Sequence, residues 1–85
     1  MTDRRALEEC IAWLHGRRTG VRYRDLAKIL QSCDCTEVAG KSSHHVWAHP
    51  SQPLRLPLVD SGRGDVLLVY IVKTRKYLES ILETL

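Results

Sequence analysis

The chain has 85 residues, of which 44% are hydrophobic and 27% are charged, a balance that is typical of a folded globular domain and excludes a disordered chain. At this length we expect one small core that buries roughly 60–65% of the unfolded surface, so residues 1–85 are predicted to form a single domain. The formal net charge is +3, a modest excess that does not by itself distinguish nucleic-acid binding from ordinary solvated surfaces.

Cellular location and redox state are also constrained by composition. No segment approaches the ~20 apolar residues of a membrane span, and the first residues lead into no signal-peptide core. We therefore expect a cytoplasmic protein with no membrane partner. The cysteines are odd in number, which favours reduced thiols over a disulfide framework; they are Cys10, Cys33 and Cys35.

Two amphipathic helices are expected in the first part of the chain. Asp3 is a suitable N-cap for the first helix, and Gly16 is expected to end it. Residues from about Arg22 to Ser32 again carry apolar side chains at helical spacing. A helix-turn-helix is excluded, because a short segment typical of a strand follows where the recognition helix would be needed. The apolar stripe of the first helix consists of Leu7, Cys10, Ile11 and Leu14.

The second part of the chain predicts three strands and a last helix. The strands are expected near Cys35–Ala39, at Ser43–His49 and at Leu54–Leu58, with a hairpin turn at Gly40–Ser42 between the first two. Proline in the third strand predicts either that this strand lies at an edge of the sheet or that the proline lies at the end of the strand. The stretch from Val66 to Val72 combines β-branched residues with helical spacing. We interpret it as an extended segment that leads into a helix from about Val69 to Thr84.

The segment from Gly40 to Pro50 is the most informative part of the sequence. It holds His44, His45 and His49, three of the four histidines, just after a basic Gly-Lys-Ser-Ser turn. The pattern resembles the signature of the HicA family of toxin ribonucleases, in which Gly-Ser-His-His is followed by an aromatic residue and then by His-Pro. Two residues are inserted relative to that pattern, namely Lys41 and Ser42.

The resemblance covers about residues 21–85 and carries several implications. It implies an α+β fold like that of double-stranded-RNA-binding domains, in which an α-β-β-β-α order forms a three-stranded antiparallel sheet with both helices on one face. Residues 1–20 then form an extra N-terminal helix and loop, suited to a packing layer or a dimer contact. The family also implies an mRNA interferase, a toxin of a toxin–antitoxin system, which is neutralised by a HicB-like antitoxin and released under stress.

Strand alternation distinguishes the adjacent histidines. His45 and His49 share a face with Trp47, whereas His44 points to the opposite side. A tryptophan of this size is expected to pack under the helices, which leaves His44 outward, at the position of the family's active-site histidine. His45 and His49 are then expected to be buried and hydrogen-bonded.

These assignments predict a metal-independent endoribonuclease without a cofactor. His44 is the predicted catalytic residue, acting as general base on a ribose 2′-OH or as general acid on the leaving 5′-oxygen. Possible catalytic support is assigned to His45, Lys41 and Ser43. RNA binding, with mRNA as the partner, is assigned to Lys41, Arg55 and Arg63.

Two alternatives stay open on the sequence. One is a zinc site, because zinc-type ligands occur at Cys33 and Cys35 and in the three histidines. Against it, Cys-x-Cys is not the usual spacing, and neighbouring residues of a strand point to opposite faces. The other alternative is a binding module for RNA or DNA without catalytic activity.

Overall fold

The computed structural model describes residues 2–85, and these form three helices and an antiparallel three-stranded sheet of strand order β1-β2-β3. The fold is therefore α+β, as expected. The helices are α1 (Arg4–Leu14), α2 (Tyr23–Ser32) and α3 (Leu68–Glu83), and the strands are β1 (Thr36–Lys41), β2 (His44–Ala48) and β3 (Leu56–Val59).

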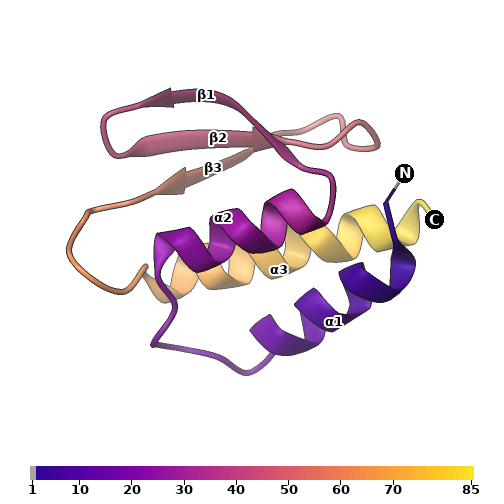
Figure 1. The fold of residues 1–85 in the computed structure, drawn as a ribbon, viewed down its shortest axis with the longest axis horizontal. Coiled ribbons are helices and arrows are strands. Elements are labelled where there is room, and N and C mark those ends of the chain that lie inside the picture. Colours follow the sequence, from indigo (N-terminus) through magenta and orange to yellow (C-terminus); the bar gives the residue numbers. More distant parts are fainter. Residues whose placement is uncertain (1) are drawn as a thin grey trace.

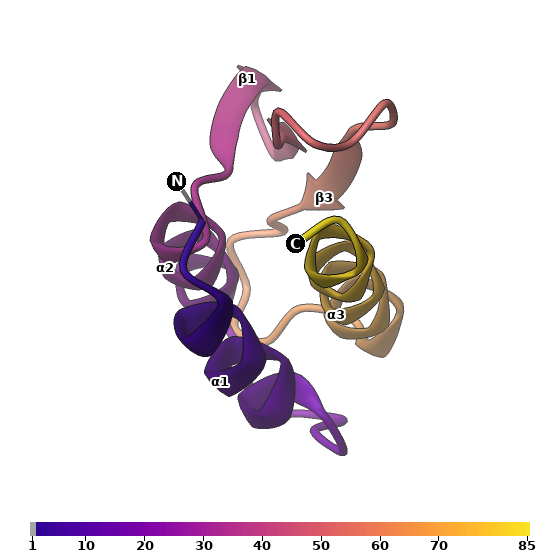
Figure 2. The same ribbon diagram turned by 90° about the vertical axis from the view of Figure 1, so that its right-hand side faces the viewer.

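The elements are arranged in layers (Figures 1 and 2). Helices α2 and α3 lie side by side beneath one face of the sheet, and α1 packs against them on the side away from the sheet. Within residues 2–85, no helix lies over the opposite face of the sheet. The N-terminal helix is thus a packing layer within the chain, one of the two roles expected for it.

The start of α1 and the end of α2 are fixed by hydrogen bonds of side chain and backbone. The Asp3 carboxylate accepts from the backbone N–H of Arg5 (2.9 Å) and caps α1 as predicted. Asp34, just after α2, adopts a left-handed φ of 63°. The N–H of Cys35 then donates to the carbonyl of Leu30 (2.9 Å), so the end of α2 has the bonding of a Schellman motif.

The predicted hairpin turn was placed wrongly. Gly40 and Lys41 belong to β1, and the turn consists of only Ser42 and Ser43. Two local features shift it: Val38 is an extra, bulged residue of β1, and Ser42 takes a left-handed φ of 60° that closes a two-residue loop.

The other strand bounds need smaller corrections. The first strand runs over 36–41 rather than 35–39, the second over 44–48 rather than 43–49, and the third over 56–59 rather than 54–58. The third strand lies at an edge of the sheet, which is the first of the two alternatives expected from its proline.

The ambiguous segment before the last helix is extended and then helical. Arg22 and Asp65 form an isolated bridge, and the N–H of Val66 donates to the carbonyl of Val21 (2.8 Å). Helix α3 begins at Leu68, one residue before the predicted start. This short backbone pairing holds the segment before α3 against the loop before α2.

One hydrophobic core joins the three helices with β2 and β3, whereas every residue of β1 is exposed. Leu7 and Leu14 of α1 are fully enclosed and belong to the same cluster as the inner side chains of the sheet. Within residues 2–85, no helix has the length and apolar character needed to cross a membrane. The central residues of the cluster are Leu7, Leu14, Leu26, Leu30, Trp47, Leu58, Ile71, Leu78 and Ile81.

We predict that Leu7→Ala lowers the free energy of unfolding by about 2–5 kcal/mol, because it removes a fully buried side chain and leaves a cavity between α1 and the rest of the core. The matched control is Leu54→Ala, which removes the same atoms from a side chain that is 77% exposed and should change stability by less than about 0.5 kcal/mol. Urea denaturation measures both. Equal effects would show that α1 does not contribute to the core.

Candidate active site

The outer face of the sheet presents a cation and an imidazole side by side. Lys41 of β1 and Val59 of β3 are the cross-strand partners of His44 in the central strand β2. Directly opposed residues project to the same face, with Cβ atoms typically 4.5–5.5 Å apart. Lys41 and His44 are both exposed. The bulge at Val38 creates this pairing, which the predicted turn would have prevented.

The side chain of His44 is exposed to solvent and has no side-chain partner among residues 2–85. Within residues 2–85, its side chain makes no hydrogen bond or ion pair. It borders a groove of about 310 Å³, called the α3 groove below, where β2 and β3 meet α3. The residues lining the α3 groove are His44, His45, Val46, Pro57, Leu58, Val59, Tyr70 and Lys73.

His45 is hydrogen-bonded and only partly buried. Its Nδ1 lies 2.6 Å from Oε2 of Glu37, and its side chain is 21% exposed. Besides the α3 groove, it lines a second hollow of about 410 Å³ against β1, called the β1 hollow. The β1 hollow is lined by Glu37, Val38, Ala39, Gly40, Lys41, Ser42 and His45.

Aromatic contacts fix the plane of the His45 ring. The Tyr23 ring stacks on it with a centroid separation of 4.5 Å and an interplanar angle of 28°. The Tyr23 hydroxyl in turn accepts from Nε1 of the buried Trp47 (2.9 Å). The pKa of Tyr23 is raised, chiefly because burial disfavours the phenolate, so the hydroxyl stays protonated.

Glycine at position 40 makes the Glu37–His45 contact possible. A Cβ on Gly40 would lie 2.3 Å from Oε2 of Glu37 and 3.4 Å from Nδ1 of His45. Gly40 is also the cross-strand partner of His45. The missing side chain therefore provides the space in which the carboxylate reaches the imidazole.

His49 has both ring nitrogens engaged. Nδ1 accepts from the backbone N–H of Ser51 (3.0 Å) and from its hydroxyl (2.8 Å), which leaves Nε2–H to donate to Oγ1 of Thr2 (2.7 Å). The residue is buried, and burial lowers its pKa, so the ring is held neutral. The expectation that this histidine is buried and hydrogen-bonded is confirmed.

The turn between β1 and β2 offers donors to an anion. Within residues 2–85, neither the N–H groups nor the hydroxyls of Ser42 and Ser43 make a hydrogen bond. The carbonyl of Ser43 accepts from the N–H of Asp60 (2.7 Å), which ties the loop after β3 to the turn. Lys41, Ser42 and Ser43 thus form a basic end of the sheet with free donors next to His44.

The basic residues assigned to RNA binding do not all gather there. Arg55 precedes β3 at its start, whereas His44 pairs with Val59 at its end, so Arg55 lies at the opposite end of the strand. Arg63 lies in the exposed loop that follows Asp60.

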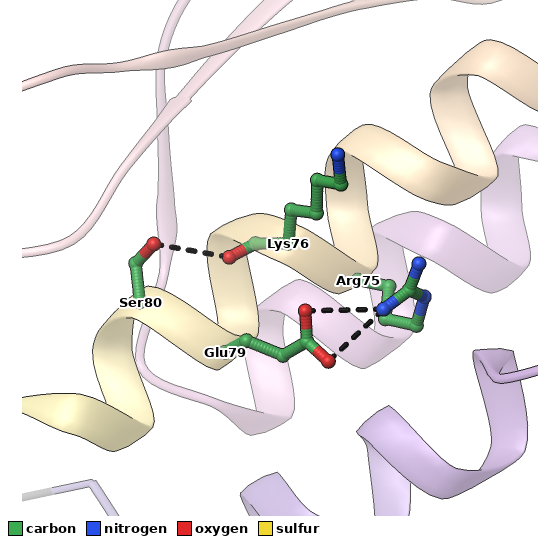
Figure 3. Close-up of polar contacts among 4 residues, drawn as sticks. All are labelled: Arg75, Lys76, Glu79 and Ser80. Atoms are coloured by element: carbon green, nitrogen blue, oxygen red, sulfur yellow. Dashed lines mark hydrogen bonds and ion pairs between the residues drawn. The ribbon is translucent and has the colours of Figure 1, made fainter.

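Helix α3 adds a cation that strand reasoning did not place in the site. Lys73 is exposed, lies 5.9 Å from the centre of the Tyr70 ring, and lines the α3 groove with His44. Arg75 is instead bound to both carboxylate oxygens of Glu79 at 3.1 and 3.0 Å, while Lys76 points away from this pair (Figure 3). The sequence places Lys73 within the predicted last helix, but only the fold brings it to the groove that His44 lines.

The zinc ligands considered above are not brought together. Within residues 2–85, no group of three or more His, Cys, Asp or Glu side chains is placed to hold a metal ion. Cys33 and Cys35 lie in the core, and burial is the main cause that raises the pKa of each thiol to about 12. Both therefore stay protonated, whereas zinc binds the thiolate.

Comparison of the chain with protein-family models, with curated proteins and with solved structures gives no match. The resemblance of the histidine segment to the HicA signature therefore stays a prediction.

Burial of neutral His49 predicts that the protein loses stability in mild acid. The unfolded chain takes up a proton as the pH falls below about 6.5, and the folded state does so only at lower pH. The free energy of unfolding should thus fall with pH below about 6.5, by at most about 1.4 kcal/mol per pH unit from this residue. Urea denaturation between pH 7.5 and 5 measures the slope. His49→Gln should flatten it, and an unchanged slope in that variant would contradict the assignment.

Proposed function

We propose that the protein is an endoribonuclease, an mRNA interferase that acts as the toxin of a type II toxin–antitoxin system. The observation that supports it best is that the exposed imidazole of His44 lies beside Lys41 on the sheet face opposite the helices. A surface of this kind accommodates an extended phosphate backbone, and the resemblance of the histidine segment gives the same substrate class.

The chemistry needs no cofactor. His44 is a proton-transfer group, either as general base on a ribose 2′-OH or as general acid on the leaving 5′-oxygen, a role worth on the order of 10²–10⁴-fold. The 2′-oxygen attacks phosphorus, the bond from phosphorus to the 5′-oxygen breaks, and the products are a 2′,3′-cyclic phosphate and a 5′-hydroxyl. Lys41 and the free donors of Ser42 and Ser43 would stabilise the charge on the phosphate. Dependence on the 2′-OH restricts the reaction to RNA.

The proposed biological setting follows from the family resemblance. The order α2-β1-β2-β3-α3, with both helices on one face, is compatible with the fold of double-stranded-RNA-binding domains. A HicB-like antitoxin would cover the basic end of the sheet and His44 in the cytoplasm and release them under stress. Arg55 and Arg63 would contact RNA beyond the cleaved nucleotide.

We predict that His44→Ala abolishes cleavage of single-stranded mRNA, because it removes the proton-transfer group, while circular dichroism and RNA affinity stay close to wild type. The matched control is His15→Ala, which removes another exposed histidine, located at the end of α1. Cleavage is measured with and without EDTA.

Each outcome of that assay decides between the candidate functions. Cleavage by wild type in EDTA that is lost only in His44→Ala supports the proposal. Loss of wild-type cleavage in EDTA would point to a metal-dependent nuclease. Binding of RNA by all three proteins without any cleavage would leave a non-catalytic binding module.

We further predict that Lys41→Ala weakens RNA binding and lowers the slope of log Kd against log salt by about 0.7–1, because one phosphate contact and its released counterion are lost. Lys28→Ala is the matched control, since Lys28 is exposed on α2, where it borders a hollow against Trp13 of α1 and not the sheet. Fluorescence anisotropy with a labelled RNA at several salt concentrations gives both slopes. Equal slopes for the two variants would show that Lys41 does not contact an RNA phosphate.

A further inference from the structure

The contact between Glu37 and His45 fixes where the imidazole proton sits. An ionised carboxylate can only accept, so Nδ1, 2.6 Å from Oε2 of Glu37, must carry the proton. In the neutral ring the lone pair then belongs to Nε2. This is the tautomer opposite to that of His49, whose Nδ1 accepts from Ser51.

The free nitrogen of His45 is accessible. Within residues 2–85, Nε2 makes no hydrogen bond, and no side-chain nitrogen or oxygen is buried without a partner, so this atom reaches solvent. Stacking on Tyr23 and the room left by Gly40 hold the ring in place. A histidine oriented by a carboxylate through Nδ1, with Nε2 open, has the arrangement of a general base.

His45 also lies close to the groove that contains His44. The two side chains leave the strand on opposite faces, yet both residues line the α3 groove with Lys73. Cleavage through the 2′-OH has two proton transfers, one from the attacking oxygen and one to the leaving oxygen. A single histidine supplies one of them at a time, which leaves the second to another group.

We propose that His45 is the second proton-transfer group of this site and that Glu37 is its positioning residue. This inference rests on the proposed ribonuclease function. Nε2 of His45 takes the proton of the 2′-OH, and the 2′-oxygen forms its bond to phosphorus. The bond from phosphorus to the 5′-oxygen breaks, and the imidazolium of His44 protonates that oxygen. Proton exchange with water then restores both rings.

The test compares kcat, KM and pH profiles of RNA cleavage for four variants. His45→Gln should lower kcat on the order of 10²–10⁴-fold and remove the limb of the profile that rises with pH. Glu37→Gln should lower kcat about 10–100-fold with KM unchanged, because Glu37 orients a base and holds no substrate. Gly40→Ala should act in the same direction, since its methyl group displaces the Glu37 carboxylate while both partners remain in the chain.

Glu79→Gln is the matched control, because it breaks a comparable ion pair between a partly exposed glutamate and Arg75 on α3 (Figure 3), and neither residue lines the α3 groove or the β1 hollow. Its kcat and pH profile should equal those of the wild type. Nitrogen-15 NMR of the imidazoles gives a readout independent of activity and of any loss of stability. His45 should be the Nδ1–H tautomer in the wild type and should lose that preference in Glu37→Gln.

The outcomes separate the two proposals. If the wild type cleaves RNA and His45→Gln and Glu37→Gln both keep its kcat and pH profile, this inference is overturned. The proposed ribonuclease function would then still hold. An Nε2–H tautomer of His45 in the wild type would also overturn this inference. Absence of cleavage by the wild type would overturn the proposed function and the inference together.

Discussion

Burial of Trp47 is the constraint on which the arrangement of the site depends. Its indole is 2% exposed beneath the sheet, and its N–H is satisfied by the Tyr23 hydroxyl. Because side chains of a strand alternate, a one-residue slip of β2 would bring the indole to the surface and reverse both faces. The register of β2 is therefore strongly specified, and the direction of each neighbouring histidine is fixed with it.

That register places three histidines of one segment in three different chemical situations. His49 has both nitrogens engaged in a buried setting, His45 has one nitrogen held by a carboxylate, and His44 is free of protein partners within residues 2–85. The environment thus determines which of three identical side chains can exchange protons with a substrate.

Sequence patterns predicted what depends on local chemistry and periodicity. The three helices, the Asp3 cap, the edge position of β3 and the inward side of Trp47 all followed from short-range rules. The hairpin turn did not, because its position depends on a bulge at Val38 and a left-handed Ser42. The contact of Glu37 with His45 also escaped prediction, since it depends on the shifted register, which moves Gly40 from the predicted turn into β1 opposite His45.

The division between core and surface decides how substitutions in this site can be interpreted. Within residues 2–85, the side chains of Lys41, Ser42 and His44 make no hydrogen bond or ion pair, so stability should hardly depend on them, and loss of activity there reports on chemistry or binding. Glu37 and His45 differ, because their pair also joins β1 to β2 and so contributes to folding. A lower rate of RNA cleavage in a Glu37 or His45 variant could therefore come from lost catalysis or from lost stability. The protonated nitrogen of the ring is the property that distinguishes an oriented base from a contact that only holds the sheet together.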